Sequence, residues 1–368
     1  MRFKSYAPNQ KKGLYIHIPF CASKCPYCSF YSVVGKNAYF DGYLAACLSE
    51  IAALPQKEFD TIYIGGGTPS HLGGERIGRF IYAFLKEISY DGTEFTVEVN
   101  PESADGDFIR ALKDLPVTRV SIGVQSLNNK VLKLLGRIHS SGDALTLIDN
   151  IRKELNVEIN ADIIFDIPRV DYKEISDTLI QLATLSLEHI SAYSYTPDTG
   201  YLATSVKDDE GEFLATEKLL EEKGYIHYEI SNYAKPCSCS KHNLKYWREE
   251  EYIGIGAGAH SMVFEREGVR RYSRPPDIEH YIKNPIKRDV NELLDDATVL
   301  KEVLVFGLRL QKGVNLLEIT ERYGKLPQDI LDKLEILEKK ELLKCESGCI
   351  SATKKGWLLL DSVTSYLW

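Results

Sequence analysis

Residues 13–30, "GLYIHIPFCASKCPYCSF", hold a short apolar run, Leu14–Ile18, that is followed at once by a loop with three cysteines. A similar order of a β-branched or aromatic run, a polar or glycine-rich loop and an amphipathic stretch recurs up to about residue 223. Strands that alternate with helices are typical of βαβ units and a parallel sheet. The sequence therefore predicts an α/β fold with a partial (β/α)6 TIM-like barrel. We expect strands at Leu14–Ile18, Thr61–Ile64, Phe95–Val99, Arg119–Val124, Glu158–Phe165 and His189–Tyr195, and helices over 37–54, 142–155 and 208–223.

The residues best suited to chemistry follow these strands. The cysteine loop comes after the first strand and "GGGTPS" (65–70) after the second, while Glu98 and Asn100 end the third strand and Gln125 ends the fourth. In such barrels the chemistry takes place at the carboxyl ends of the strands. Asp162 lies inside the apolar fifth strand, where a carboxylate is costly unless it is paired in a polar interior. We therefore expect one site at this rim, with a structural aspartate and a strand-end cap as the simpler alternatives for Asp162 and Gln125.

The composition is that of an ordinary folded protein without an electrostatic surface for nucleic acid. The chain has 368 residues, 44% of them hydrophobic, and a formal net charge of −8. Nucleic-acid platforms instead need a basic surface. The N-terminal residues show no apolar core of signal-peptide length, and no apolar run reaches the roughly 18 residues of a membrane span. We expect a cytoplasmic protein whose eight cysteines stay reduced, so that their spacing becomes a question of metal binding.

Three segments are expected along the chain. Residues 1–223 form the barrel, residues 224–288 lose the periodicity and cover its open side, and residues 289–368 form a small helical domain. This last segment has helical patterns at 295–310, 316–323 and 327–340, a turn at "CESGC" (345–349) and a final helix, an order that resembles a winged helix. Because it has 11 Lys and Arg against 14 Asp and Glu, a DNA-binding regulator is the weakest function class.

Cys21, Cys25 and Cys28 are spaced so that their thiolates can converge on one metal ion or cluster. A zinc site would need a fourth protein ligand, for which His17 is nearest. An iron–sulfur cube normally takes four cysteines, so three would leave one iron open to a small molecule. The glycines at 65–67 let a ligand approach the backbone closely. Groups for an amine, a carboxylate and ribose hydroxyls are offered by Glu98, Gln125, Arg137 and Asp162, although a surface helix charge is the simpler alternative for Arg137.

The C-x3-C-x2-C arrangement of "CASKCPYC" (21–28) resembles that of the radical S-adenosylmethionine (SAM) family. "GGGTPS" is similar to the motif by which that family holds the methionyl amine. The resemblance implies a [4Fe-4S] cluster on Cys21, Cys25 and Cys28, with SAM on the fourth iron. It also implies that reductive cleavage of SAM releases a 5′-deoxyadenosyl radical, while the protein supplies placement and excludes water.

Further motifs, spread from residue 14 to 247, resemble the oxygen-independent coproporphyrinogen III oxidase family, in particular its heme-chaperone branch. They are "LYIHIPFC", "EVNPES", "VSIGVQSLNNKVLKLLGRIH", "HISAYSYTPDTG", "HYEISNYAKP" and "HNLKYW". By this resemblance Tyr15 would lie against the SAM sulfonium and Tyr27 near the adenine. The amino acid moiety would contact Gly66, Gly67 and Thr68. The positions that hold one or two SAM molecules in the oxidase are matched by Glu98, Gln125, Arg137 and Asp162.

Two departures separate the chain from the oxidase branch. The oxidase has a fourth cysteine two residues after the third, where this chain has Phe30, and a longer arm before the cluster, whereas twenty residues precede Cys21. The chain has instead "HNLKYW" (242–247), which matches the H-N-x-x-Y-W motif of the chaperone branch. Imidazole is a good axial ligand of heme iron, and aromatic rings can stack on a porphyrin. The expected heme residues are therefore His242, Tyr246 and Trp247, with a buried aromatic core as the alternative.

The predicted function is a heme chaperone that binds heme and a SAM-liganded cluster and transfers heme to acceptor hemoproteins. The alternative is oxygen-independent coproporphyrinogen III oxidation, which gives protoporphyrinogen IX. Expected partners are SAM, heme or a porphyrinogen, acceptor hemoproteins that include membrane-associated ones, and an electron donor, for a monomer or homodimer that binds no nucleic acid. Cys237 and Cys239 stand just before the motif, and surface thiols are their simpler interpretation, with a thiolate ligand for heme iron as the alternative.

Overall fold

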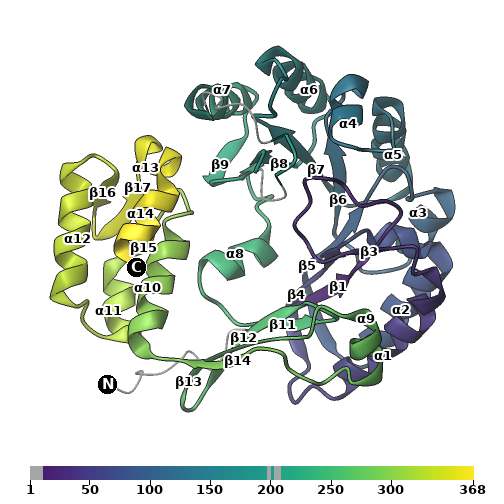
Figure 1. The fold of residues 1–368 in the computed structure, drawn as a ribbon, viewed down its shortest axis with the longest axis horizontal. Coiled ribbons are helices and arrows are strands. Elements are labelled where there is room, and N and C mark those ends of the chain that lie inside the picture. Colours follow the sequence, from purple (N-terminus) through teal and green to yellow (C-terminus); the bar gives the residue numbers. More distant parts are fainter. Residues whose placement is uncertain (1–10, 197–199, 203–208) are drawn as a thin grey trace.

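The computed structural model describes residues 11–196, 200–202 and 209–368. Within them one sheet of twelve strands runs in the order β14-β13-β12-β11-β1-β4-β5-β6-β7-β8-β10-β9. Its central strands are the six predicted ones, and they lie parallel to one another. They are β1 (Lys12–Ile18), β4 (Glu58–Gly66), β5 (Ser89–Val99), β6 (Arg119–Gln125), β7 (Glu158–Phe165) and β8 (His189–Ser194). The sheet curves into a barrel that stays open, as Figure 1 shows, so the partial barrel is confirmed.

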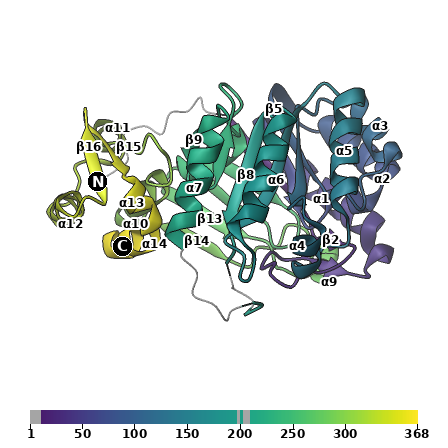
Figure 2. The same cartoon turned by 90° about the horizontal axis from the view of Figure 1, so that it is seen from above.

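Helices cover the convex face of this sheet (Figures 1 and 2). They are α1 (Phe40–Ala52), α2 (Gly74–Leu85), α3 (Gly106–Lys113), α4 (Asn129–Leu134), α5 (Ser141–Glu154), α6 (Tyr172–Thr184) and α7 (Asp209–Glu222). Successive side chains of a strand point to opposite faces. In β6, Val120, Ile122 and Val124 are completely buried, whereas the alternate positions line cavities on the concave face. The apolar half of each strand therefore forms the core with the helices.

The concave face of the sheet is polar. Its inward side chains include Glu94, Arg119 and Glu158 toward the amino ends of the strands, Thr96, Ser121, Asn160 and Ser191 in the middle, and Glu98, Asp162 and Tyr193 toward the carboxyl ends. In the middle layer, Asn160 Nδ2 lies 2.7 Å from Ser121 Oγ, 2.8 Å from Asp162 Oδ1 and 3.0 Å from Ser191 Oγ. Buried polar groups need such partners. The interior is thus ordered by hydrogen bonds, and Asp162 sits in the paired polar setting that its strand position required.

Residues 224–288 form regular strands, which corrects the expectation that their periodicity is lost. β9 (Ile226–Glu229) and β10 (Asn232–Ala234) extend the sheet beyond β8, while β11 (Tyr252–Ile255), β12 (His260–Glu265) and β13 (Gly268–Ser273) extend it beyond β1. Between these groups, α8 (Lys241–Trp247) crosses the opening of the barrel (Figure 1). A short helix α9 (Ile278–Lys283) follows and packs on α1. Strands of three to six residues are too short to show a clear alternation.

The C-terminal part contains the helices and the hairpin that its sequence predicts. After β14 (Asn291–Leu294), which pairs with β13 and so belongs to the large sheet, come α10 (Asp296–Gly307), α11 (Leu316–Tyr323), α12 (Gln328–Lys339), α13 (Lys354–Leu358) and α14 (Leu360–Leu367). A small sheet is formed by β15 (Val314–Asn315), β17 (Cys349–Ala352) and β16 (Leu343–Glu346).

This domain is tied to the β9 edge of the barrel. The Ile230 amide donates to the Arg309 carbonyl at 3.0 Å, and the Gln311 amide donates to the Tyr228 carbonyl at 3.0 Å. The domain therefore stands beside the opening of the barrel, opposite the helices of the convex face (Figure 1). None of the helices in the described part of the chain is long and apolar enough to cross a membrane.

Candidate cofactor site

Just beyond the carboxyl end of β1, Cys21 ends β2 (Phe20–Cys21), and Cys25 and Cys28 lie on the loop that joins β2 to β3 (Val33–Val34). All three are free and partly exposed. The loop is held at its base, because the Val33 amide donates to the Pro19 carbonyl at 2.7 Å and the Thr68 amide donates to the Phe20 carbonyl at 2.8 Å. The thiols are thereby presented at the rim where the sequence places them.

Two side chains from other loops reach the sulfur atoms. Thr68 Oγ1 donates to Cys21 Sγ at 3.6 Å, and Arg137 Nη1 donates to Cys25 Sγ at 3.5 Å. Asn100 joins the two, since its Nδ2 donates to Thr68 Oγ1 at 2.9 Å and its Oδ1 accepts from Arg137 Nη2 at 2.8 Å. Burial raises the pKa of the Cys21 thiol, and the hydrogen bond from Thr68 acts in the opposite direction. The cysteine loop and the strand ends therefore form one connected site.

A pocket of about 360 Å³ opens beside the thiols. Besides the three cysteines, its wall contains the predicted residues Tyr27, Gly66, Gly67, Thr68, Glu98, Gln125, Arg137 and Asp162. Tyr15 is the exception among the predicted residues, and its ring lies behind Tyr63, with the two ring centroids 6.1 Å apart. The Tyr15 hydroxyl contacts His17 Nδ1 at 2.8 Å. The structure thus brings all but one of these side chains together around a single volume.

Glu98 is held by the glycine-rich turn. The Gly66 amide donates to Glu98 Oε2 at 2.9 Å, and the Tyr63 hydroxyl donates to Oε1 at 2.6 Å. Gly66 has φ 113°, and a Cβ there would stand 2.3 Å from His17 Nδ1, so only glycine fits. Burial raises the pKa of Glu98 to about 7, and the nearby charge of Asp162 contributes in the same direction.

Arg137 and Gln125 are fixed by the backbone of β6. Arg137 is not a surface charge, because its side chain is only 7% exposed and Nη2 donates to the Gly123 carbonyl at 3.1 Å. Its Nε has no hydrogen-bond partner among the described residues. Gln125 ends β6 with φ 62°, at a register shift opposite Ile163, and this turns its side chain into the pocket wall. Both side chains therefore face a ligand volume rather than solvent.

The thiol geometry suits a cluster better than a single zinc ion. His17, the candidate fourth ligand for zinc, has both ring nitrogens engaged, by the Tyr15 hydroxyl and by the Tyr31 carbonyl at 3.0 Å from Nε2. In the described ranges no three or more His, Cys, Asp or Glu side chains converge as ligands of one ion. In an iron–sulfur cube each cysteine binds a different iron atom, so the three thiols need not converge on a single metal position.

Family comparisons agree with this assignment. Residues 15–182 match the model of the Radical SAM superfamily, and residues 294–359 match that of the HemN C-terminal domain. The chain is 32% identical to the heme chaperone HemW of Lactococcus lactis over 365 residues, which cover 95% of both proteins. The chain belongs to the HemW family of radical SAM proteins. It is also 32% identical to HemW of Bacillus subtilis over 375 residues, or 96% of this chain and 98% of that protein.

The fold has a solved counterpart outside the HemW family. The structure of coproporphyrinogen III oxidase HemN from Escherichia coli superposes with a TM-score of 0.82 over 97% of this chain and 90% of that one, at 21% identity. At this identity the similarity concerns the fold, including the C-terminal domain. Membership of the radical SAM superfamily implies a [4Fe-4S] cluster and SAM in the HemW family. A bound cluster of this kind supplies the electron that cleaves SAM.

The predicted heme residues are not on the wall of this pocket. His242 on α8 is completely buried, its Nδ1 lies 2.9 Å from Thr61 Oγ1, and its Nε2 lies 2.9 Å from the Tyr246 hydroxyl. Its ring stacks on Tyr63 at a centroid distance of 5.3 Å, and burial lowers the pKa of His242 to about 3. Trp247 points the other way, with the Arg309 guanidinium 4.1 Å from its ring. The motif thus links the barrel interior to the C-terminal domain.

Two residues of the site, Tyr63 and Tyr193, were not singled out in the sequence, whereas Asn100 was expected at the end of the third strand. Tyr63 positions Glu98, Asn100 connects the two groups at the thiols, and Tyr193 forms part of the pocket wall. Tyr63 and Tyr193 occupy inward positions near the carboxyl ends of β4 and β8. Counting alternate positions back from each strand end would have found them. The motif "HISAYSYTPDTG" is described only in part, since residues 197–199 lie outside the described residues.

Proposed function

We propose that this chain binds heme and passes it to acceptor hemoproteins, while it holds a [4Fe-4S] cluster and SAM at the carboxyl rim of the barrel. The observation that carries the proposal is the similarity over nearly the whole chain to relatives named heme chaperone HemW, at 32% identity over 95% of this chain in the Lactococcus lactis protein. Phe30 supports it, because an apolar ring that is 69% exposed stands on the pocket wall at the place of the fourth cysteine of the oxidase.

For SAM, we propose contacts that follow from the charges around the pocket. The carboxylate of Glu98, beside the backbone of residues 65–67, suits the ammonium group, and the buried guanidinium of Arg137 suits the carboxylate. Asp162, which also accepts from Ser121 Oγ at 3.0 Å, suits ribose hydroxyls, and Tyr27 offers a ring for the adenine. Tyr15 acts from behind Tyr63. These residues hold and orient SAM.

The affinity for SAM should depend on the ionisation of Glu98. With a folded-state pKa of about 7, the carboxyl is largely protonated at pH 6 and must lose its proton to pair with the ammonium. The Kd for SAM should therefore rise about tenfold per pH unit below 7 and level off above it. Equilibrium dialysis of SAM between pH 5.5 and 8 measures this. Glu98→Gln should bind weakly at every pH, and a wild-type profile without a bend near 7 would contradict the role.

The same shift has a consequence for the protein without SAM. The pKa of Glu98 is higher in the folded state than the ordinary value near 4.5, so the folded protein binds more protons between pH 4.5 and 7. The stabilisation that this extra proton on Glu98 gives the folded protein is complete at low pH and is lost as the pH rises through this window. Urea unfolding at several pH values should show this fall in wild type and a smaller one in Glu98→Gln.

For heme, we propose that His242 becomes an iron ligand only when α8 moves, because both its ring nitrogens are engaged in the closed form. Hemin binding should then show a fast second-order phase and a slower phase whose rate does not depend on hemin concentration. Tyr246→Phe removes one hydrogen bond, of about 1 kcal/mol, and should speed the slow phase about fivefold. Stopped-flow absorbance in the Soret region measures both phases. A slow spectral change that persists unaltered in His242→Ala would exclude this residue as the ligand.

Turnover of a porphyrinogen separates the proposal from the oxidase alternative. Anaerobically reconstituted protein is incubated with SAM, a reductant and coproporphyrinogen III, and the porphyrins are separated by chromatography after oxidation. We expect coproporphyrin alone, whether or not 5′-deoxyadenosine is formed. Protoporphyrin that increases with time and depends on SAM would identify an oxidase and overturn the chaperone proposal.

A further inference from the structure

A second cavity, of about 150 Å³, lies at the other end of the barrel, near the amino ends of β6 and β7. Strand residues Thr93, Thr118 and Arg119 line it together with Cys237, Cys239 and Lys241 from the segment that leads into α8. The carboxylates of Glu94 and Glu158 complete its wall. It shares no lining residue with the pocket beside the cluster cysteines. The SAM and heme proposals therefore leave this cavity without a role.

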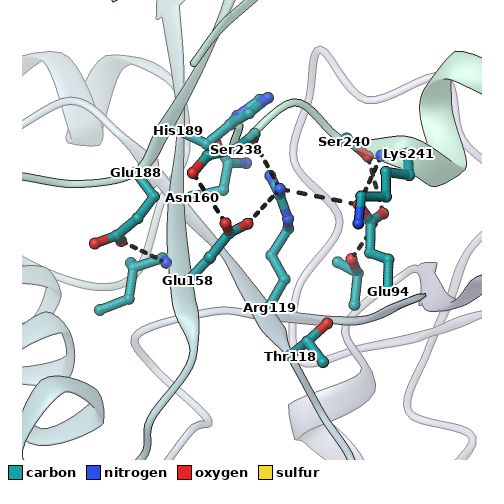
Figure 3. Close-up of polar contacts among 12 residues, drawn as sticks. Glu94, Thr118, Arg119, Glu158, Asn160, Glu188, His189, Ser238, Ser240 and Lys241 are labelled. Carbon is teal, nitrogen blue, oxygen red and sulfur yellow. Dashed lines mark hydrogen bonds and ion pairs between the residues drawn. The ribbon is translucent and has the colours of Figure 1, made fainter. Parts of the chain in front are cut away.

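Arg119 lines this cavity and also a smaller one in the barrel interior. It is 3% exposed and reaches between Glu158 and Glu94, as Figure 3 shows. Its Nη2 donates to Glu158 Oε2 at 2.5 Å and to the Ser238 carbonyl at 2.8 Å. Its Nε and Nη1 have no hydrogen-bond partner among the described residues. Leaving donors of a buried guanidinium unpaired costs free energy, so these N–H groups call for an acceptor from outside the chain.

The two carboxylates are committed to other partners. Glu94 accepts from the Lys241 amide at 2.6 Å, the His242 amide at 3.1 Å and Ser240 Oγ at 3.2 Å, as the right side of Figure 3 shows in part. Glu158 Oε1 accepts from Ser238 Oγ at 2.9 Å, in addition to its pairing with Arg119. Both therefore hold the segment before α8 in place, and neither satisfies Arg119 Nε or Nη1.

Two cations and two carboxylates line the cavity, and two further cations, Arg248 and Lys312, lie near Cys239. Three cations, Arg119, Arg248 and Lys312, are near enough to lower the pKa of Cys239, although burial raises it overall. Lys241 adds a fourth cation on the cavity wall, against the two carboxylates of Glu94 and Glu158. Positive charge, unpaired N–H donors and a polar wall together suit an anion with oxygen acceptors.

We propose that this cavity binds a small oxyanion, a phosphate or carboxylate group whose oxygens accept hydrogen bonds from Arg119 Nε and Nη1. The anion lies beside Cys239, which lines the same cavity, and beside Lys241 at its mouth. It completes the hydrogen bonding of the arginine that holds the Ser238 carbonyl, and so steadies the entry to α8. The site is independent of the heme proposal, since it rests on the unpaired N–H groups of Arg119 and on the cations near it, and on no contact with heme.

Alkylation of Cys239 tests the site with a native reporter. The cluster-loaded full chain carries Cys237→Ser, so that the tryptic peptide 224–241 contains one thiol, and reacts with the uncharged reagent iodoacetamide. Inorganic phosphate or acetate is added at constant ionic strength, and chloride is added in a third, parallel reaction. Mass spectrometry measures the rate at which Cys239 is alkylated. We expect saturable slowing, to about a tenth of the rate at ten times the Kd, with phosphate, acetate or both and none with chloride. An unchanged rate with both oxyanions would overturn the proposal.

Variants locate the effect. Arg119→Gln should abolish the protection. Lys241→Gln changes an exposed residue whose Nζ donates to the Thr93 carbonyl at 3.3 Å, and it should raise the midpoint at least about threefold. Lys86→Gln, which changes an exposed lysine over the Tyr82 ring, is the matched control and should leave the midpoint unchanged. If Lys241→Gln and the folded Arg119→Gln protein are both protected with the wild-type midpoint, the anion binds elsewhere. That result would overturn the proposal.

Discussion

Replacing any one of Cys21, Cys25 and Cys28 by alanine should abolish the [4Fe-4S] cluster. Three thiolates provide the whole protein ligand set at this loop, and the groups around them, Thr68 and Arg137, can only adjust the sulfur atoms. Replacing a residue that only supports the ligands typically lowers metal affinity 10–100-fold. Replacing a ligand itself should lower the affinity further. Iron and acid-labile sulfide in anaerobically reconstituted protein measure the cluster, and 5′-deoxyadenosine formation measures its use of SAM.

The other thiols provide the controls for this experiment. Cys345→Ser and Cys237→Ser alter exposed cysteines outside the rim and should retain full iron and sulfide. Cys47→Ala removes a completely buried thiol and should lower stability without altering the cluster content of the folded protein. A variant of Cys21, Cys25 or Cys28 that holds a complete and SAM-reactive cluster would contradict the assignment of the site.

Arg274→Met should destabilise the protein by about 3–5 kcal/mol, because it leaves a buried carboxylate without its cation. Glu50 on α1 is 1% exposed and accepts from Arg274 Nε at 2.5 Å, from the Tyr281 hydroxyl at 2.5 Å and from the Gly256 amide at 3.1 Å. This cluster fixes the β11–β13 extension against the barrel. Urea unfolding of the cluster-loaded chain measures the change in the free energy of unfolding.

Two comparisons separate the buried pair from ordinary ion pairs. Arg79→Met breaks an exposed i,i+4 pair with Glu75, 3.6 Å apart, and should cost less than about 1 kcal/mol. Adding Glu50→Gln to Arg274→Met removes the unpaired charge and should recover a large part of the loss. Equal costs for the two arginine variants would show that Glu50 does not depend on Arg274.

The sequence was most informative where the periodicity is strong. β7 and α11 have the bounds that were predicted, because each has an unbroken pattern flanked by clear ends. The rim was predictable for a topological reason, since parallel strands bring their carboxyl ends together whatever the intervening residues are. Glu98 and Asp162 could therefore be placed in one pocket before any coordinate was known, although more than sixty residues separate them.

The rest depended on contacts that no local pattern encodes. The location of His242 follows from α8 crossing the opening of the barrel, where Thr61 from β4 meets its ring. The Arg119 cavity needs residues of β6, β7 and the segment before α8 to converge, and the sequence gives no period that relates them. The strands of residues 224–288 were missed because they add to two opposite edges of the sheet, and each is too short to show alternation.

Hemin titration of the reconstituted chain tests the central claim most directly. The protein is kept anaerobic with its cluster intact, hemin is added stepwise, and the Soret absorbance is followed before and after gel filtration. The account predicts saturable binding with a Kd in the micromolar range or tighter, about −8 kcal/mol, and heme that stays with the protein and moves to an added apo-hemoprotein. Hemin that separates from the folded, cluster-loaded chain on gel filtration would contradict the account.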